Sequence, residues 1–351
     1  MARAPKVQEF EEDEDLPVRA NPDLYGHLDA AARLEAAARS GRLPHAWLIC
    51  GPPGIGKATL AYRFARWLLA GGPDRPEEPG TPPLHLDPAH PAFRRIAAGA
   101  HADLRTLRPA TDTGVRRTIR VDAMRDALHF LGMTSAEGGW RALVVDQLEL
   151  SMPQAQHAFL KTLEEPPPRV ALLLTSAAPD RLLPTIRSRC RRLDLDPLGA
   201  GDMDAVLKRL LPDQNATERA RLATMAEGSP GRALELSEGD GLAIQQLVEQ
   251  ALGGLAQGSR RDWHAIADAV AAKRDGSAFM TFMALLRREI SAASRRAARG
   301  QPAPAWLGLR PLAEWSTLWD SLARLAAETD GLSLDRKQAV LTALGWLSPR
   351  R

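Results

Sequence analysis

One glycine-rich stretch, residues 51–59, constrains the fold of this chain of 351 residues more than any other, and its sequence is Gly-Pro-Pro-Gly-Ile-Gly-Lys-Ala-Thr. The apolar run before it, residues 46–50, predicts a buried strand, and the amphipathic run after it, residues 60–69, predicts a helix. Strand, glycine-rich turn and helix form the context of a P-loop, in which backbone N–H groups point at phosphate oxygens. The stretch therefore predicts a phosphate site.

Two positions depart from a hydrolytic site. Ala58 follows the lysine where a hydroxyl would hold Mg²⁺, and Thr59 comes one residue later, so on a helix it points about 100° away. A buried strand predicted over residues 142–146 ends in a carboxylate that could position Mg²⁺. Gln147 follows it, and an amide cannot accept a proton from an attacking water. The predicted nucleotide-binding residues are Gly51, Gly54, Gly56, Lys57, Thr59 and Asp146.

Composition is that of an ordinary globular protein, with 44% apolar and 25% charged residues, so a sizeable core is expected. Cys50 and Cys190 lie far apart in the sequence, which argues against a disulfide framework or a cysteine-rich zinc site and fits the cytoplasm. No signal peptide or membrane-length apolar run is visible, so no membrane contact is expected.

The chain divides by pattern into four parts. Residues 1–20 contain an acidic run between prolines and predict a disordered tail. Strand and helix signals alternate over residues 21–196, which predicts an α/β domain with a parallel sheet between helices. Residues 197–241 predict a small helical unit, and residues 242–351 are helical throughout with several tryptophans, which are typical of packing between helices.

A loop-rich insert over residues 71–102 contains four possible metal ligands. They are His85, Asp87, His90 and His101. No cysteine accompanies them, and surface histidines in such an insert are much more common than a metal site.

Three arginines precede a helix predicted to begin near Asp122. They are Arg116, Arg117 and Arg120. Arginine beside a helix N-terminus can hold a nucleic-acid backbone, and such residues can equally form a solvated face.

Three segments together carry a family resemblance. They are Gly41–Trp47, which leads into the P-loop, Leu160–Pro167, with the sequence Leu-Lys-Thr-Leu-Glu-Glu-Pro-Pro, and Ser188–Cys190, with the sequence Ser-Arg-Cys. From about Leu24 to its C-terminus the chain resembles the delta-prime family of subunits of the bacterial DNA polymerase III clamp loader, which are AAA+ type proteins. The last two segments are highly specific to clamp-loader subunits, whereas a P-loop alone is not.

The resemblance implies an architecture and several roles. It implies an AAA+ type P-loop α/β domain over residues 21–196, a helical lid over 197–241 and a helical collar for oligomerisation over 242–351. The implied assembly is a five-subunit ring with gamma/tau and delta subunits, which loads the sliding clamp on primer-template DNA in replication. Arg189 would be an arginine finger acting in trans on a gamma/tau-type subunit, and Arg232 falls where a lid domain carries a sensor arginine.

Departures from the family pattern decide between functions. Many members carry a cysteine-ligated zinc module where residues 71–102 have no cysteine, so no zinc is expected. The missing hydroxyl at Ala58 and the amide at Gln147 predict a non-motor stator that requires no cofactor and holds ATP or ADP, if at all, without hydrolysis. An active gamma/tau-type ATPase, with Thr59 in place of the missing ligand, is the alternative. A stand-alone P-loop ATPase is the third reading, and the finger motif disfavours it.

Overall fold

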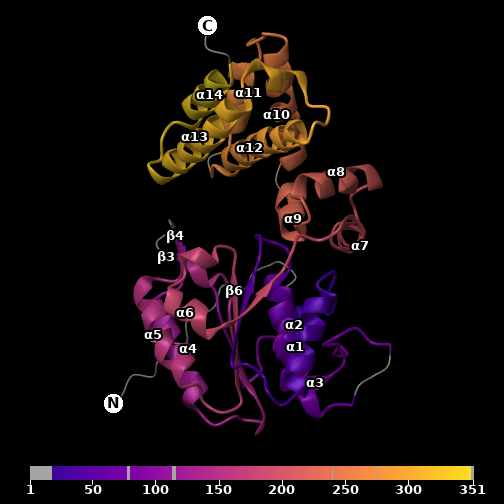
Figure 1. Cartoon of the computed structure of the whole chain (residues 1–351), viewed down its shortest axis with the longest axis vertical. Coiled ribbons are helices and arrows are strands. Elements are labelled where there is room, and N and C mark those ends of the chain that lie inside the picture. Colours follow the sequence, from indigo (N-terminus) through magenta and orange to yellow (C-terminus); the bar gives the residue numbers. More distant parts are fainter. Residues whose placement is uncertain (1–17, 77–79, 113–115, 239, 274, 349–351) are drawn as a thin grey trace. The chain divides into compact units, whose positions relative to one another are not determined.

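The computed structural model describes residues 18–76, 80–112, 116–238, 240–273 and 275–348 (Figure 1). Most of the predicted disordered tail lies outside these ranges. The chain forms two compact units, one of residues 1–209 with 227–231 and the other of residues 210–226 with 232–351, and each is described by itself. The predicted domain boundaries at residues 196 and 241 stay predictions.

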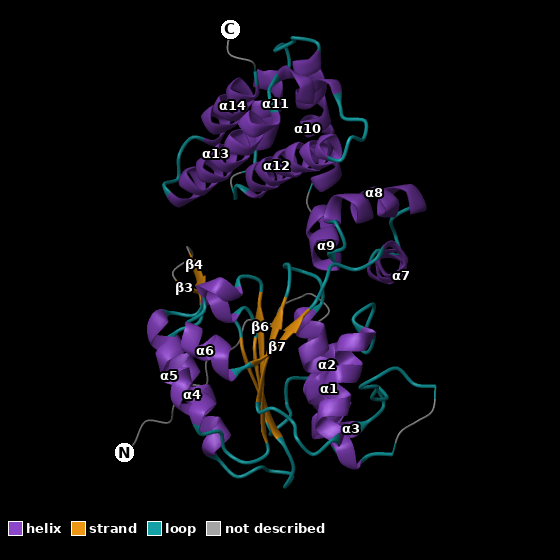
Figure 2. Ribbon diagram, in the orientation of Figure 1, coloured by secondary structure: helices purple, strands orange, loops and turns teal. Residues whose placement is uncertain are grey.

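A five-stranded parallel sheet lies at the centre of the first unit (Figure 2). Its strands, in spatial order, are β2 (Leu104–Leu107), β5 (Arg141–Val145), β6 (Val170–Ser176), β1 (Ala46–Cys50) and β7 (Arg191–Asp194). All four neighbouring pairs are parallel, which requires crossover connections and confirms the predicted α/β domain with a parallel sheet between helices. β1, β5 and β6 are buried along their whole length, because helices cover both faces of the sheet.

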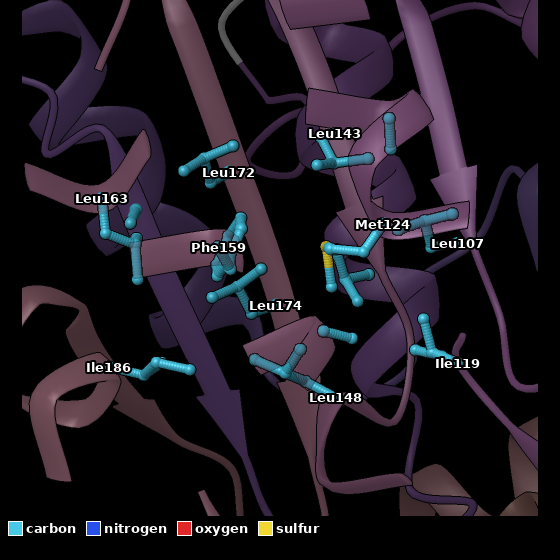
Figure 3. Close-up of a cluster of buried hydrophobic side chains, with 14 of the residues drawn as sticks. Leu107, Ile119, Met124, Leu143, Leu148, Phe159, Leu163, Leu172, Leu174 and Ile186 are labelled. Carbon is cyan, nitrogen blue, oxygen red and sulfur yellow. The ribbon is translucent and has the colours of Figure 1, made fainter. Parts of the chain in front are cut away.

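The helices of this unit form a layer on each face of the sheet (Figure 2). One layer contains α1 (Leu28–Arg39), α2 (Lys57–Leu69) and α3 (Pro91–Ala97), and the other contains α4 (Val121–Gly132), α5 (Pro153–Glu164) and α6 (Pro184–Arg189). Figure 3 shows the core under the second layer, where Phe159 and Met124 pack with strand residues such as Leu172. The other elements are four short 3₁₀ helices, η1 (Val18–Ala20), η2 (Gly72–Asp74), η3 (Leu148–Leu150) and η4 (Pro179–Arg181), and the helix α7 (Ala200–Leu210).

Two local features differ from what the sequence indicates. Ser151 looks like a cap for α5, yet the helix begins at Pro153 after Met152, and the Ser151 hydroxyl donates to the Leu148 carbonyl at 2.6 Å. Proline suits a first helical position because its missing N–H would have no partner there. A short antiparallel pair, β3 (Ala110–Asp112) with β4 (Arg116–Thr118), was not predicted.

Buried arginines fix the outer side of α2. Arg66 is 1% exposed and donates to the carbonyl oxygens of Arg19 at 2.6 Å and Asn21 at 2.7 Å. Burial lowers the pKa of Arg66 to about 10, and its guanidinium also lies over the ring of Phe93. These bonds hold the segment before α1 against the helix that begins at the P-loop lysine.

The second unit is helical, as predicted. Its elements are α8 (Ala216–Ala226), most of α9 (Pro230–Glu238), α10 (Gly241–Ala256), α11 (Trp263–Ala271), α12 (Ser277–Ala298), η5 (Ala305–Leu309), α13 (Leu312–Gly331) and α14 (Arg336–Leu347). Trp315 is fully buried, lies edge-on to Trp306 at 5.2 Å between ring centroids, and donates its indole N–H to the Leu307 carbonyl. None of the helices that the structure describes is long and apolar enough to cross a membrane.

Candidate functional site

The turn between β1 and α2 has the backbone of a phosphate-binding loop. Gly51, Gly54 and Gly56 have φ angles of 151°, 71° and 103°, which residues with a side chain rarely adopt. A Cβ atom at Gly51 would lie 2.5 Å from the Leu195 carbonyl oxygen, so only glycine fits there. Gly56 directly precedes α2, whose N-terminal N–H groups can attract an anion.

The Lys57 ammonium is bound by its own loop. Its Nζ atom donates to the carbonyl oxygens of Gly51 at 2.8 Å and Pro52 at 2.6 Å, and the residue is 7% exposed. Burial lowers the pKa of Lys57 from its ordinary value, while the carboxylates of Glu149 and Asp146 oppose that shift. A phosphate group in this loop would have to compete with the two carbonyl oxygens for the ammonium.

Asp146 meets Thr175 at the ends of neighbouring strands. The Thr175 hydroxyl donates to Asp146 Oδ1 at 2.5 Å and accepts from the backbone N–H of Gln147 at 2.9 Å. Thr175 is fully buried, so its hydroxyl fixes the direction of the carboxylate. The structure therefore places Asp146 at the edge of the sheet where the P-loop also begins, because Gly51 follows β1, which pairs with β6.

Glu149 is a residue of this site that the sequence reasoning missed. Its Oε1 atom accepts from the Ala177 N–H at 2.8 Å. The preceding residue, Ser176, accepts the Gly51 N–H at 3.2 Å, so Glu149 is anchored beside the start of the P-loop. Its negative charge acts on Lys57. The available signal was a carboxylate three residues after Asp146, and local pattern alone gave it no role.

Ser229 and Gly231 also contact the P-loop and were not predicted to do so. The Ser229 hydroxyl donates to the Pro53 carbonyl at 2.9 Å, and the Gly231 N–H donates to the Gly54 carbonyl at 2.9 Å. A Cβ atom at Gly231 would lie 2.9 Å from the Gly54 Cα, so this close approach requires glycine. Arg232 follows in α9 and belongs to the second unit, and its sensor role stays a prediction.

The residues of the loop fit a phosphate group better than a phosphate-bound Mg²⁺. Ala58 is the second residue of α2 and offers no side-chain oxygen, and the partly buried Thr59 follows it in the helix. Gln147 supplies no base beside Asp146. The site can therefore bind an anion through N–H groups and an ammonium, while two of the usual participants in hydrolysis are missing.

The polar residues of the insert serve local structure. The His90 Nδ1 atom accepts the Ala92 N–H at 3.2 Å and caps α3, and the His101 Nδ1 atom accepts the Asp103 N–H at 3.2 Å. Within the ranges given above, no group of three or more His, Cys, Asp or Glu residues is placed to hold a metal ion. The expected absence of zinc stays a prediction.

Arg189 is the last residue of α6 and its side chain is 36% exposed. Its Nη1 atom donates to the Thr185 carbonyl at 3.1 Å, and its Nη2 atom lies 2.7 Å from Glu164 Oε1. Ile186 anchors α6 in the core under α4 and α5, on the face of the sheet opposite α2 (Figure 2). Arg189 and the P-loop helix thus belong to different layers.

The three arginines before α4 are divided between two elements. Arg116 and Arg117 form β4 with Thr118, and their side chains lie outside the described part of the chain. Arg120 directly precedes α4, and its Nε atom lies 3.4 Å from Asp122 Oδ1 with both side chains exposed. Contact of these residues with DNA stays a prediction.

The thiol of Cys190 packs against the core although it ends the Ser-Arg-Cys segment. Burial raises the pKa of Cys190 to about 12 and that of Cys50 to about 11, so both stay protonated at pH 8.

Because the thiolate is the reactive form, we expect iodoacetamide at pH 8 to alkylate each of these two cysteines at least about a hundredfold more slowly in the folded chain than in urea. Mass spectrometry checks this, and equal rates would contradict the described burial.

Comparisons with known proteins find relatives among the subunits of DNA polymerase III. A family model described as DNA polymerase III, delta subunit, matches residues 26–199. The delta-prime subunit of DNA polymerase III from Pseudomonas aeruginosa is 37% identical over 207 residues, 58% of this chain and 60% of the relative. The Escherichia coli delta-prime subunit is 34% identical over 222 residues, 63% of this chain and 62% of the relative. The matched region thus spans about three-fifths of the length of these relatives.

Two further matches concern related subunits. The Escherichia coli DNA polymerase III subunit tau is 31% identical over 245 residues, 66% of this chain and 36% of the relative. A crystal structure of a DNA polymerase III gamma subunit-related protein from Thermotoga maritima is 16% identical, with a TM-score of 0.48, and the match covers 92% of this chain and 98% of that one.

Proposed function

This chain belongs, over residues 26–199, to the delta-prime family of DNA polymerase III clamp-loader subunits, and we propose on that premise that it is a non-motor stator of the clamp loader. In this proposal it braces a five-subunit ring with gamma/tau and delta subunits in the cytoplasm. It supports loading of the sliding clamp on primer-template DNA during replication. It also donates Arg189 to the ATP site of a neighbouring subunit.

The chemistry of its own loop supports a site that does not hydrolyse ATP. The loop keeps its glycines and Lys57, which favours phosphate binding. Ala58 removes an Mg²⁺ ligand and Gln147 removes a base, so nothing in the loop replaces the two groups that hydrolysis uses. ATP or ADP would bind here without turnover, and no cofactor would be required for the stator role.

The position of Arg189 is the observation that carries the proposal. The guanidinium is half-exposed at the end of a helix in the layer opposite α2, which suits an arginine that acts on another subunit's nucleotide. A guanidinium supplied in this way stabilises charge on the transferring phosphoryl group and is worth about 10³–10⁵ in rate. The C-terminal helices of the second unit would supply the collar through which the subunits assemble.

An active gamma/tau-type ATPase is the second candidate, and the match to the Escherichia coli tau subunit favours it. In that case Thr59 would take the place of the missing hydroxyl. ATP turnover by the isolated chain separates the two candidates, since only an active ATPase would hydrolyse ATP steadily.

We expect the isolated chain to hydrolyse ATP no faster than background, because Ala58 lacks the hydroxyl that would hold Mg²⁺ and Gln147 cannot act as a base. Release of inorganic phosphate at saturating ATP and Mg²⁺ is the measurement. Steady hydrolysis that disappears in Lys57→Ala would show a working motor and would contradict the stator role. The complementary test is turnover of the reconstituted ring with Arg189→Ala in this chain.

A further inference from the structure

The three family segments, far apart in sequence, meet at the last turn of α5. His45, from the segment before β1, places its Nε2 atom 3.0 Å from the carbonyl oxygen of Leu163. The next residue, Glu164, places Oε1 2.7 Å from Nη2 of Arg189. Leu163 itself is buried in the core. The Glu164 carboxylate, which pairs with Arg189, therefore lies at a helix end that is fixed in place. The buried side chain of Leu163 and the contact from His45 fix it.

Two anchors define the orientation of the Arg189 guanidinium. A guanidinium has five N–H donors in one plane. Nη2 is paired with Glu164 and Nη1 donates to the carbonyl of Thr185, one turn earlier in the same helix. Because the anchors engage different nitrogens, they restrict rotation of the plane and leave other donors of the fork for a phosphate oxygen.

We propose that Glu164 is a positioning residue, which holds Arg189 in the orientation that reaches the nucleotide of the neighbouring subunit. This inference rests on the proposed role of Arg189 in trans. A long, half-exposed arginine has many rotamers, and a catalytic group contributes fully only when its geometry is set before the reaction. Glu164 restricts those rotamers from a rigid support.

A stability role explains the pair poorly. The two side chains are 36% and 50% exposed, and ion pairs of that kind contribute little to folding. A neighbouring pair offers a matched control, because Arg187 lies on the same helix, is also 36% exposed, and has Nη1 3.0 Å from Oδ1 of Asp180. Asp180 is 92% exposed, so that pair lacks the rigid support of α5.

The test is steady-state ATP turnover of a ring reconstituted with gamma/tau-type subunits. With Glu164→Ala in this chain we expect kcat to fall about two- to threefold, which is less than the fall expected for Arg189→Ala, with KM for ATP unchanged. Glu164→Gln, which keeps one acceptor oxygen without the charge, should give a smaller fall. Asp180→Ala should leave kcat unchanged. Ring assembly on size exclusion and the Tm of the isolated chain should not move in any of these variants.

Measuring Arg189→Ala beside Glu164→Ala distinguishes failure of the positioning role from failure of the proposed function. If that variant lowers kcat and Glu164→Ala does not, the positioning role is wrong while the proposed function stands. If Arg189→Ala itself leaves kcat intact, the proposed function fails and the inference fails with it. A rise in kcat with Glu164→Ala would show that the carboxylate restrains the finger, which also overturns the proposal. In the double variant, Glu164→Ala should cause no loss beyond that of Arg189→Ala.

Discussion

Arg189→Ala is expected to lower the ATP turnover of a reconstituted ring several-fold, and to remove a factor of about 10³ or more at the one site that this arginine serves. The alanine variant leaves the developing charge on the transferring phosphoryl group without its guanidinium. Because Arg189 is proposed to serve one site of the ring, turnover of the whole ring should fall less than turnover at that site. Phosphate release by rings containing the variant, compared with wild-type rings at equal concentration, is the measurement.

Arg187→Ala is the control for this prediction. Arg187 lies on the same helix as Arg189, has the same exposed fraction of 36%, and forms its own ion pair with Asp180. Neither variant should change the free energy of unfolding by more than about 1 kcal/mol, since exposed ion pairs contribute about that much at most. A ring that keeps full turnover with Arg189→Ala would rule out the role in trans.

Phe159→Ala should lower the free energy of unfolding of the first unit by about 3–5 kcal/mol, because it removes a large side chain from a closed core. Phe159 is fully buried on α5 and lies beside Leu172 and Leu174 of β6 (Figure 3). A chain with two compact units need not unfold in one step, so amide hydrogen exchange is the suitable measurement. Loss of protection should be confined to the first unit.

Phe159→Leu provides the graded comparison and should cost distinctly less, because leucine fills part of the space. Since α5 ends at Glu164, the alanine variant should also loosen the support of Arg189. A change below about 1 kcal/mol in Phe159→Ala would mean that α5 is not packed on the sheet as described.

The sequence predicted well those parts of the fold that local pattern determines. The strand over residues 46–50 was predicted with its observed bounds, because an apolar run met a glycine-rich turn. Asp146 was expected as the last residue of a buried strand, and it directly follows β5, which ends at Val145. The start of α5 is ambiguous in the sequence, because Ser151 is a possible cap, whereas Pro153 suits the first helical position and is where the helix begins. The pair β3 and β4 is short and polar and leaves no periodic signal.

Contacts between distant segments could not be predicted from the sequence. His45 and Leu163 are 118 residues apart, and nothing in either neighbourhood indicates the partner. The same holds for Ser229 at the P-loop, since a run of Gly, Ser and Pro indicates a turn but not what the turn touches. The residue types of the candidate site were therefore predictable, whereas the orientation of Arg189 by Glu164 required the three-dimensional structure.

The P-loop is held in its shape by hydrogen bonds to its own carbonyl groups. Five consecutive carbonyl oxygens, of residues 51–55, all accept hydrogen bonds from side chains or backbone of the same unit. Their partners are Lys57 for the first two, then Ser229, Gly231 and His27. A loop whose acceptors are satisfied internally keeps its shape without a ligand. In this chain the loop therefore also serves as a connector, because its own hydrogen bonds tie β1, α2 and residues 229–231 together.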